Sequence, residues 1–489
     1  MFKAVQKEII NEQNKSAKSS LEFDFEYLEK KLKENQIDIR SILDQVKKFQ
    51  VAVPTWGVGT GGTRFARFPG IGEPQNIYDK IEDCAVINDL IGFTNKVSPH
   101  FPWDNVDDFS ELKEFADEYG IGFDVVNSNT FQDPSDGSET FKYGSLTNAS
   151  SAIRDKAIEV NIQSIESGKA LGSKGLTVWI GDGGNFPGQI SFSKSLERYI
   201  DSMKKIYATL PKDWTVLLEH KPYEPAFYST VISDWGTSYV CAKELGEQAM
   251  CLVDLGHHLP NTNIEMVVSR LIDVDKLGGF HFNDSKFGDD DLDAGSINPY
   301  ELFLIFNELT VASQNNKIKN IAYMIDQSHN VTDPIESLIS SANEIVNSYT
   351  KSLLVNFSSL EMVNGLSRLA TRFNNDELKL DLLRKLIGDK LNAEKAFMEE
   401  LITVIPDDLD WSDEIRLSVE ERTSFSPDAL TGLEANLRFP GKETCETKIF
   451  GRLTAWQNWI FNRPNAVSEK GALKLFGTGS RAKFDNKRV

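Results

Sequence analysis

The sequence predicts an eight-stranded βα barrel, because three features of its middle section agree. Short apolar segments alternate with longer stretches of helical apolar spacing, and there are eight of each. An acid or an imidazole stands at the carboxyl end of four successive apolar segments, as Glu219, Asp254, His281 and Asp326. In a βα barrel the carboxyl ends of all strands meet at one mouth, so these side chains should converge. A doubly wound open sheet would gather its ligands at one switch point, so the barrel explains the pattern better.

The apolar segments are the expected strands, and the helical stretches between them are the expected helices. We place the strands at 51–55, 95–99, 121–127, 175–181, 214–219, 249–254, 278–283 and 320–326. We place the helices at 75–91, 108–119, 149–171, 192–209, 237–248, 262–276, 298–313 and 333–350. Capping residues support three of the helix starts, at Asp108, at Asn263 and at Asp333, where a proline follows in the first turn.

Two segments flank the barrel, which we assign to residues 51–351. Residues 1–50 are charged and carry apolar positions at helical spacing, which predicts a helical segment packed on the amino end of the barrel. Residues 352–489 open with two amphipathic stretches, at 358–372 and 376–402, and then lose periodicity. We expect this mostly helical C-terminal extension to be an oligomerisation arm, packed on its own or a neighbouring subunit.

Composition restricts the class of partner. The 489 residues include 53 basic and 73 acidic ones, for a net charge of −20. This charge opposes extended contact with nucleic acid or anionic lipid and favours a small neutral or cationic ligand. The four cysteines form no CxxC pair and are typical of reduced thiols. The chain has no apolar leader, and no apolar run reaches the about 18 residues that a membrane span needs, so we expect a cytoplasmic protein.

The strand-end residues predict a metal centre, because three carboxylates and one imidazole suit Mn²⁺, Mg²⁺ or Co²⁺ better than a thiolate zinc site. The following loops add a second set: His257 lies three residues beyond Asp254, while Asp289 and Asp291 follow His281 and point the same way in an extended loop. Two divalent ions would neutralise carboxylates that could not all ionise in one pocket. Taken alone, an acidic run is usually a solvated loop, and an Asp at the end of a strand is usually a helix cap. Here the acidic loop follows four successive strands that each end in a possible ligand, and this combination favours metal sites.

Other side chains are expected at the same mouth. Lys221 lies two residues after Glu219, where it would hold a substrate oxygen, protonate an alkoxide, or form a salt bridge at the rim. Aromatic and imidazole groups near the first, second and fourth strands would suit the C–H face of a sugar, although aromatics equally form core: Trp56, His100, Trp103 and Trp179. The GxGxxG match at 57–62 is followed by TRFARFPGIGEP rather than a helix, so we reject a dinucleotide site.

Five stretches resemble L-rhamnose isomerase, in the subgroup known for broad activity on rare aldoses. They are WGVGTGGTRFARFPG (56–70), WIGDGGNFPGQ (179–189), EHKPYEPAFYSTV (219–231), DLGHHLPN (254–261) and GGFHFNDSKFGDDDLDAGSINPY (278–300). The resemblance covers about residues 50 to 350. It implies a (β/α)₈ TIM barrel, usually a homotetramer, that interconverts an aldose and a 2-ketose with two divalent ions. Mn²⁺ is the expected ion, with Co²⁺ or Mg²⁺ as alternatives.

The resemblance also implies roles for individual residues. The structural metal would be held by Glu219, Asp254, His281 and Asp326, and the catalytic metal by His257, Asp289 and Asp291. Lys221, His257 and Asp326 would serve catalysis, beside a metal-bound water. The resemblance also places Lys221 near the substrate and Phe65 of a neighbouring subunit at the site. The other expected substrate contacts follow from the strand positions of Trp56, His100, Trp103 and Trp179. The implied reaction converts L-rhamnose to L-rhamnulose by a hydride shift from C2 to C1, with the water moving the O2 proton; an enediol route stays open.

Three alternatives remain at this point. A related metal-dependent barrel could act on another sugar, as a hydroxypyruvate-isomerase-like protein. An apurinic-endonuclease-like protein would need a basic groove, which the net charge of −20 opposes. A catalytically silent, sugar-binding barrel would use its C-terminal extension as the interaction element, but the intact ligand set disfavours it.

Overall fold

The computed structural model describes residues 7–34, 37–59, 72–134, 137, 139–224, 228–318, 320–328, 332–355, 357, 392–398, 405, 407, 409–438 and 448–485. The chain divides into two compact units, Met1–Val355 and Asn356–Val489. Phe65 and the expected helix at 358–372 lie outside the described residues, as does most of the stretch at 376–402. No helix in the described part of the chain is both long and apolar enough to cross a bilayer.

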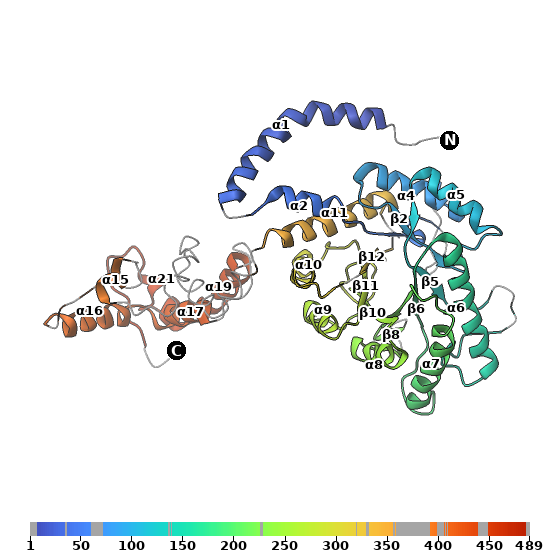
Figure 1. Ribbon diagram of the computed structural model, residues 1–489. Helices are drawn as coiled ribbons and strands as arrows, with labels where there is room; N and C mark the ends of the chain where they lie inside the picture. Colours follow the sequence, from blue (N-terminus) through green and yellow to red (C-terminus); the bar gives the residue numbers. More distant parts are fainter. Residues whose placement is uncertain are drawn as a thin grey trace. The chain divides into compact units, whose positions relative to one another are not determined.

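The first unit is a closed parallel barrel, which confirms the predicted fold class (Figure 1). Its strands are β1 (Val53–Pro54), β2 (Lys96–Ser98), β3 (His100–Phe101), β4 (Gly122–Phe123), β5 (Val126–Asn129), β6 (Gly175–Trp179), β7 (Thr215–Glu219), β10 (Ala249–Asp254), β11 (Leu277–Phe282) and β12 (Ala322–Ile325). They pair in the orders β1-β2-β4 and β12-β11-β10-β7-β6-β5-β3. The barrel closes where the Ala52 amide donates to the Tyr323 carbonyl (2.8 Å) and the Ile325 amide donates to the Ala52 carbonyl (2.9 Å).

Two of the eight expected strands are each divided in two. The second comprises β2 and β3, and the third comprises β4 and β5. Pro99 lies between β2 and β3, and it has no N–H to continue the ladder of hydrogen bonds. The loop after β7 adds a short antiparallel hairpin, β8 (Tyr223–Glu224) and β9 (Tyr228–Ser229). The barrel therefore keeps eight strand positions although more strands are counted.

Helices cover the outside of the barrel in the predicted alternation (Figure 1). They are α4 (Ile77–Ile91), α5 (Phe109–Tyr119), α6 (Ser151–Leu171), α7 (Phe192–Tyr207), α8 (Trp235–Leu245), α9 (Ile264–Asp273), α10 (Pro299–Gln314) and α11 (Pro334–Leu353), with a short α3 (Thr55–Val58) after β1. The expected caps are present: the side chains of Asp108, Asn263 and Asp333 accept hydrogen bonds from amides in the first turn of α5, α9 and α11. Before the barrel come α1 (Lys7–Glu34) and α2 (Ile39–Val46), and α2 buries Ile39 and Ile42.

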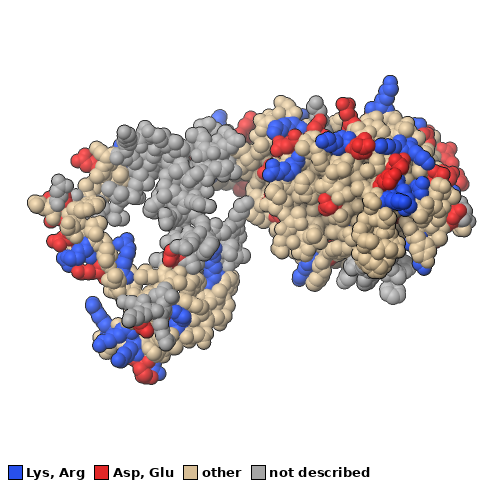
Figure 2. Space-filling model, turned by 90° about the horizontal axis from the view of Figure 1, so that it is seen from below, with Lys and Arg blue, Asp and Glu red and all other residues tan. Residues whose placement is uncertain are grey.

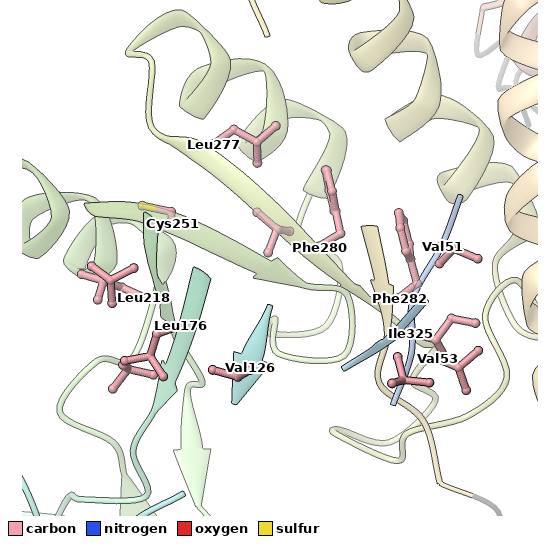
Figure 3. Close-up of a cluster of buried hydrophobic side chains, with 14 of the residues drawn as sticks. Val51, Val53, Val126, Leu176, Leu218, Cys251, Leu277, Phe280, Phe282 and Ile325 are labelled. Atoms are coloured by element: carbon pink, nitrogen blue, oxygen red, sulfur yellow. The ribbon is translucent and has the colours of Figure 1, made fainter. Parts of the chain in front are cut away.

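Strand side chains alternate between two apolar layers. The larger layer fills the space between strands and helices, and Figure 3 shows part of it, including Val126, Leu176, Leu218 and Phe280. A smaller cluster lies inside the barrel and contains Ala52, Val125, Leu217, Leu252 and Met324. Since successive residues of a strand face opposite sides, the residue after each outward-facing one points to the barrel interior.

The second unit has short helices in its described part: α15 (Ala393–Met398), α16 (Trp411–Thr423), α17 (Pro427–Arg438), the π-helical segment η1 (Lys448–Leu453), α19 (Thr454–Ile460), α20 (Pro464–Val467) and α21 (Ala472–Leu475). The side chain of Asp428 is fully buried and pairs with Arg463, whose Nε lies 3.0 Å from Oδ1. No residue of α16 is buried.

Candidate metal centre

Four predicted ligands converge at the carboxyl ends of neighbouring strands. Glu219, Asp254 and His281 lie at or near the ends of β7, β10 and β11, and Asp326 directly follows β12. Their potential ligand atoms all lie within 4.8 Å of one another. The first three residues are buried and Asp326 is partly buried. The barrel therefore brings together residues that are spread over more than a hundred positions of the chain.

Strand alternation explains why the three carboxylates face one another. Leu217, Leu252 and Met324 belong to the interior apolar cluster. The residue two places later on an extended chain faces the same side, one layer nearer the mouth. Those residues are Glu219, Asp254 and Asp326.

The close approach of three carboxylates to one imidazole makes this cluster a favourable place for a cation. His281 Nδ1 lies 3.3 Å from Glu219 Oε1, 3.6 Å from Asp326 Oδ2 and 3.7 Å from Asp254 Oδ2. Burial raises the pKa of Asp254 to about 7. Burial alone would lower the pKa of His281, but Glu219 and Asp326 raise it to about 9. These shifts show that the carboxylates repel one another and attract positive charge, and three carboxylates with one imidazole fit a divalent cation that prefers oxygen ligands.

The second predicted ligand set adjoins the first. His257 Nδ1 lies 3.1 Å from Glu219 Oε1, and its Nε2 lies 2.7 Å from Asp289 Oδ1. Lys221 Nζ is paired with Asp289 Oδ2. Asp291 lines the same cavity as Asp289. Glu219 thus stands between the two sets, where it can contribute to both.

The loop that carries Asp289 and Asp291 is not extended, contrary to the expectation from sequence. Both residues have left-handed backbones, with φ of 53° and 51°. The Asp290 carboxylate accepts hydrogen bonds from the amides of Lys286, Phe287 and Gly288 at 2.7–3.1 Å. This turn around Asp290 brings both neighbouring aspartates to the cavity.

Aromatic side chains form part of the cavity wall, and three of the four predicted ring residues lie there: Trp56, His100 and Trp179. Trp56 also supports the metal centre, since its Nε1 donates to Asp326 Oδ1 at 2.6 Å. Lys221 is buried, with Nζ 5.2 Å from the centre of the Trp179 ring. Trp103 is not among the residues described as lining the cavity, but its ring contacts two residues that are, His100 and Phe131.

Sequence reasoning missed the polar side chains on β5 and β6. Asn127, Ser128, Asn129 and Thr177 line the cavity, and so does Phe131 in the loop after β5. A signal was present in the VNSN segment of β5, where three polar residues stand in a strand that is buried on both faces. Polar residues at the carboxyl end of a barrel strand are typical of a site.

Comparisons with known proteins identify relatives of the barrel. The family model for the xylose isomerase-like TIM barrel matches residues 90–310. A probable sugar isomerase of Mesorhizobium japonicum is 59% identical over 355 residues, which cover 72% of this chain and 82% of that protein. A probable sugar isomerase of Rhizobium meliloti is 57% identical over 354 residues, again 72% of this chain and 82% of that protein.

A third relative differs in kind. Benzoyl-CoA-dihydrodiol lyase of Aromatoleum evansii is 58% identical over 135 residues. This match covers 28% of the chain and 24% of the lyase, so the chain spans only about a quarter of that enzyme.

Proposed function

Because the chain belongs to the xylose isomerase-like TIM-barrel family, we propose that it is a metal-dependent isomerase that interconverts an aldose and a 2-ketose. L-Rhamnose and L-rhamnulose are the first pair to test. One observation carries the proposal: a buried cluster of three carboxylates and an imidazole that could hold a metal ion adjoins a cavity lined by aromatic and amide side chains. The names of the two relatives as probable sugar isomerases support the same reaction class.

The ligand sets divide between two divalent ions, with Mn²⁺ as the expected metal and Co²⁺ or Mg²⁺ as alternatives. One ion would be held by Glu219, Asp254, His281 and Asp326. The other would be held by His257, Asp289 and Asp291. Bound there, divalent cations act as Lewis acids that polarise the oxygens at C1 and C2 of an open-chain sugar.

Protein groups position the sugar and its protons. Lys221 is buried beside Asp289, so its ammonium group can hold a sugar oxygen and share a proton with it. Burial lowers the pKa of His100 and keeps its ring neutral. Its Nδ1 lies 3.3 Å from the Ser98 carbonyl, to which it donates, which leaves Nε2 as an acceptor for a sugar hydroxyl. The rings of Trp56, Phe131 and Trp179 exclude water from this side of the cavity.

The arrangement favours a hydride shift over an enediol route. An enediol route needs a carboxylate that is free to remove the C2 proton. Every carboxylate among the described cavity residues belongs to one of the two ligand sets. A hydride shift from C2 to C1 needs only polarised oxygens and a proton acceptor for O2.

The expected partner is one small sugar. On the face of the barrel unit shown in Figure 2, acidic and basic side chains are interspersed rather than gathered in a basic groove. This distribution and the net charge of −20 disfavour a nucleic-acid substrate. A homotetramer, with Phe65 of a neighbouring subunit closing the site, completes the proposal.

The test is ketose formation from L-rhamnose by chelator-treated protein, with and without added Mn²⁺. We expect activity only with the metal, and L-mannose, L-lyxose, D-allose and D-ribose then rank the substrates. Failure on every aldose despite stoichiometric metal binding would favour the alternatives, a hydroxypyruvate-isomerase-like enzyme or a silent sugar-binding barrel.

A substitution tests the assignment of the second ligand set. His257→Ala should fold normally and show no isomerase activity, because it removes the imidazole between Glu219 and Asp289. The control is Lys286→Ala, which changes an exposed residue near Asp289 in the same loop and should retain activity. An active His257→Ala would refute the assignment.

A further inference from the structure

The floor of the cavity carries polar atoms that no described residue satisfies. Val126, Leu176 and Leu218 face the helices in the outer apolar layer (Figure 3). The next residues along the three strands, Asn127, Thr177 and Glu219, therefore face the interior. Asn127 is 3% exposed and Thr177 is 1% exposed, and both line the cavity.

The register of the strands places the two floor residues side by side. Asn127 pairs with Thr177, and Thr177 pairs with Leu217 of the interior cluster. The floor thus lies one layer below Glu219. Trp179 is two residues beyond Thr177 on β6, so it stands on the wall above this floor.

Three polar atoms here have no hydrogen-bond partner within the described part of the chain: Asn127 Oδ1, Thr177 Oγ1 and Trp179 Nε1. Buried polar atoms are almost always hydrogen-bonded, so three such atoms that face one cavity are suited to form hydrogen bonds with a bound molecule. Asn127 Nδ2 is directed to the Pro99 carbonyl at 3.4 Å, which leaves Oδ1 as an acceptor toward the cavity. Trp179 Nε1 can only donate, and Thr177 Oγ1 can do either.

We propose that Asn127, Thr177 and Trp179 form a recognition site for hydroxyl groups of the sugar. The inference rests on the proposed isomerase function and deepens it. A hydroxyl donates to Asn127 and accepts from Trp179, whereas a phosphate dianion or a carboxylate cannot donate to Asn127 Oδ1. The site therefore selects neutral polyhydroxy sugars over sugar phosphates and sugar acids.

The matched pair Thr177→Val and Thr177→Ser tests this site. Valine keeps the shape and removes the hydroxyl, while serine keeps the hydroxyl. We expect Thr177→Val to lower kcat/KM on the best aldose roughly ten-fold, mainly through KM, and Thr177→Ser to restore it. On the monodeoxy analogue that lacks the recognised hydroxyl, wild type and Thr177→Val should be equal. The proposal would be overturned if Thr177→Val left kcat/KM unchanged. It would also be overturned if Thr177→Val lowered kcat/KM equally on every analogue, which would indicate that Thr177 holds a buried water or serves packing.

A binding measurement separates this inference from the proposed reaction. The open-chain polyol L-rhamnitol is titrated calorimetrically into the full-length, Mn²⁺-loaded wild type and Thr177→Val. Weaker binding to Thr177→Val, with unchanged Mn²⁺ affinity, supports the site even if no aldose is isomerised. Equal binding to both proteins refutes the site even if isomerase activity is present.

A separate observation concerns the second unit. The sugar isomerase relatives match 72% of the chain, a share that corresponds to the unit Met1–Val355. The lyase relative matches 28% of the chain, a share that corresponds to Asn356–Val489. We infer that residues 356–489 are a lyase-related segment joined to the barrel, and that metal and sugar binding by the barrel do not require them.

The described part of the second unit exposes apolar side chains on α16. Trp411, Ile415 and Val419 lie at four-residue spacing on one face of α16, and each is about half exposed. The fully buried Asp428 and its partner Arg463 form a polar contact rather than an apolar core.

Cleavage of the folded full-length chain tests this inference. A recognition sequence for a site-specific protease is inserted after Val355, and the uncut protein serves as the control. After cleavage and gel filtration, Mn²⁺ affinity and L-rhamnitol binding should stay with the barrel fragment at unchanged strength, and so should any isomerase activity. Loss of metal or polyol binding on cleavage would show that residues 356–489 contribute to the site.

Discussion

The hydrogen bond from Trp56 to Asp326 should decide how tightly the metal centre binds its cation. Trp56 is 5% exposed, and its indole N–H lies 2.6 Å from Asp326 Oδ1. Trp56→Phe keeps a ring at this position, beside His100, but removes the donor. A hydrogen bond to a charged acceptor contributes about 1.5–3 kcal/mol. Loss of a donor that orients a ligating carboxylate typically lowers metal affinity about 10–100-fold, which is the same range.

The assay is calorimetric titration of Mn²⁺ into chelator-stripped protein. Trp179→Phe is the matched control, because it removes an indole N–H that has no partner among the described residues. We expect weaker Mn²⁺ binding for Trp56→Phe and unchanged binding for Trp179→Phe. Affinity of Trp56→Phe within two-fold of wild type, or an equal loss in both variants, would refute the reasoning.

Three further predictions concern charge. Without metal the pKa of Asp254 is about 7 and that of His281 about 9, so Mn²⁺ binding should expel protons. Mn²⁺ affinity should then rise from pH 6 to 8, with buffer-dependent binding enthalpies; a pH-independent affinity would contradict this. Lys80→Met leaves the buried Asp104 carboxylate without its ammonium partner at 2.8 Å, and should lower the free energy of unfolding by about 3–5 kcal/mol in urea titrations. If the free energy of unfolding fell by less than about 1 kcal/mol, groups other than Lys80 would have to stabilise the Asp104 carboxylate. Burial and neighbouring acids raise the pKa of Asp83 to about 6, so its contribution to stability is lost as pH rises through 4 to 6. Because Asp83 is partly exposed, Asp83→Asn should raise the free energy of unfolding by only about 1 kcal/mol at pH 7 and should not change it at pH 4. An equal increase at both pH values would show that titration of Asp83 is not the cause.

The metal ligands on the strands were predictable because two simple rules place them. A strand alternates its faces every residue, and a barrel brings the carboxyl ends of its strands to one mouth. Glu219, Asp254 and Asp326 follow from these rules once the strands are located. Asp289 and Asp291 were expected at the cavity because an extended loop would point both side chains the same way. The loop is instead a turn around Asp290, and this turn brings both side chains to the cavity.

The cavity wall was less predictable. Trp103 was expected to line the cavity, and its ring contacts the lining residues His100 and Phe131, so its role toward a substrate stays a prediction. Asn127 was missed although it stands among three polar residues of β5, and Thr177 was missed because a single polar residue in a strand is not distinctive until the register of adjacent strands is known.

By itself, the sequence determined the eight-fold alternation of strands and helices and the types of side chain at the strand ends. Periodicity and capping are local properties, so a linear reading captures them. Only the tertiary structure decided which atoms meet: Trp56 donates to Asp326 across 270 positions of the chain, and Glu219 stands between two ligand sets. The first contact arises where the barrel closes between β1 and β12, and the second depends on the parallel register of β7, β10 and β11. Both join segments that are distant in the sequence, so the periodicity of one segment does not reveal them.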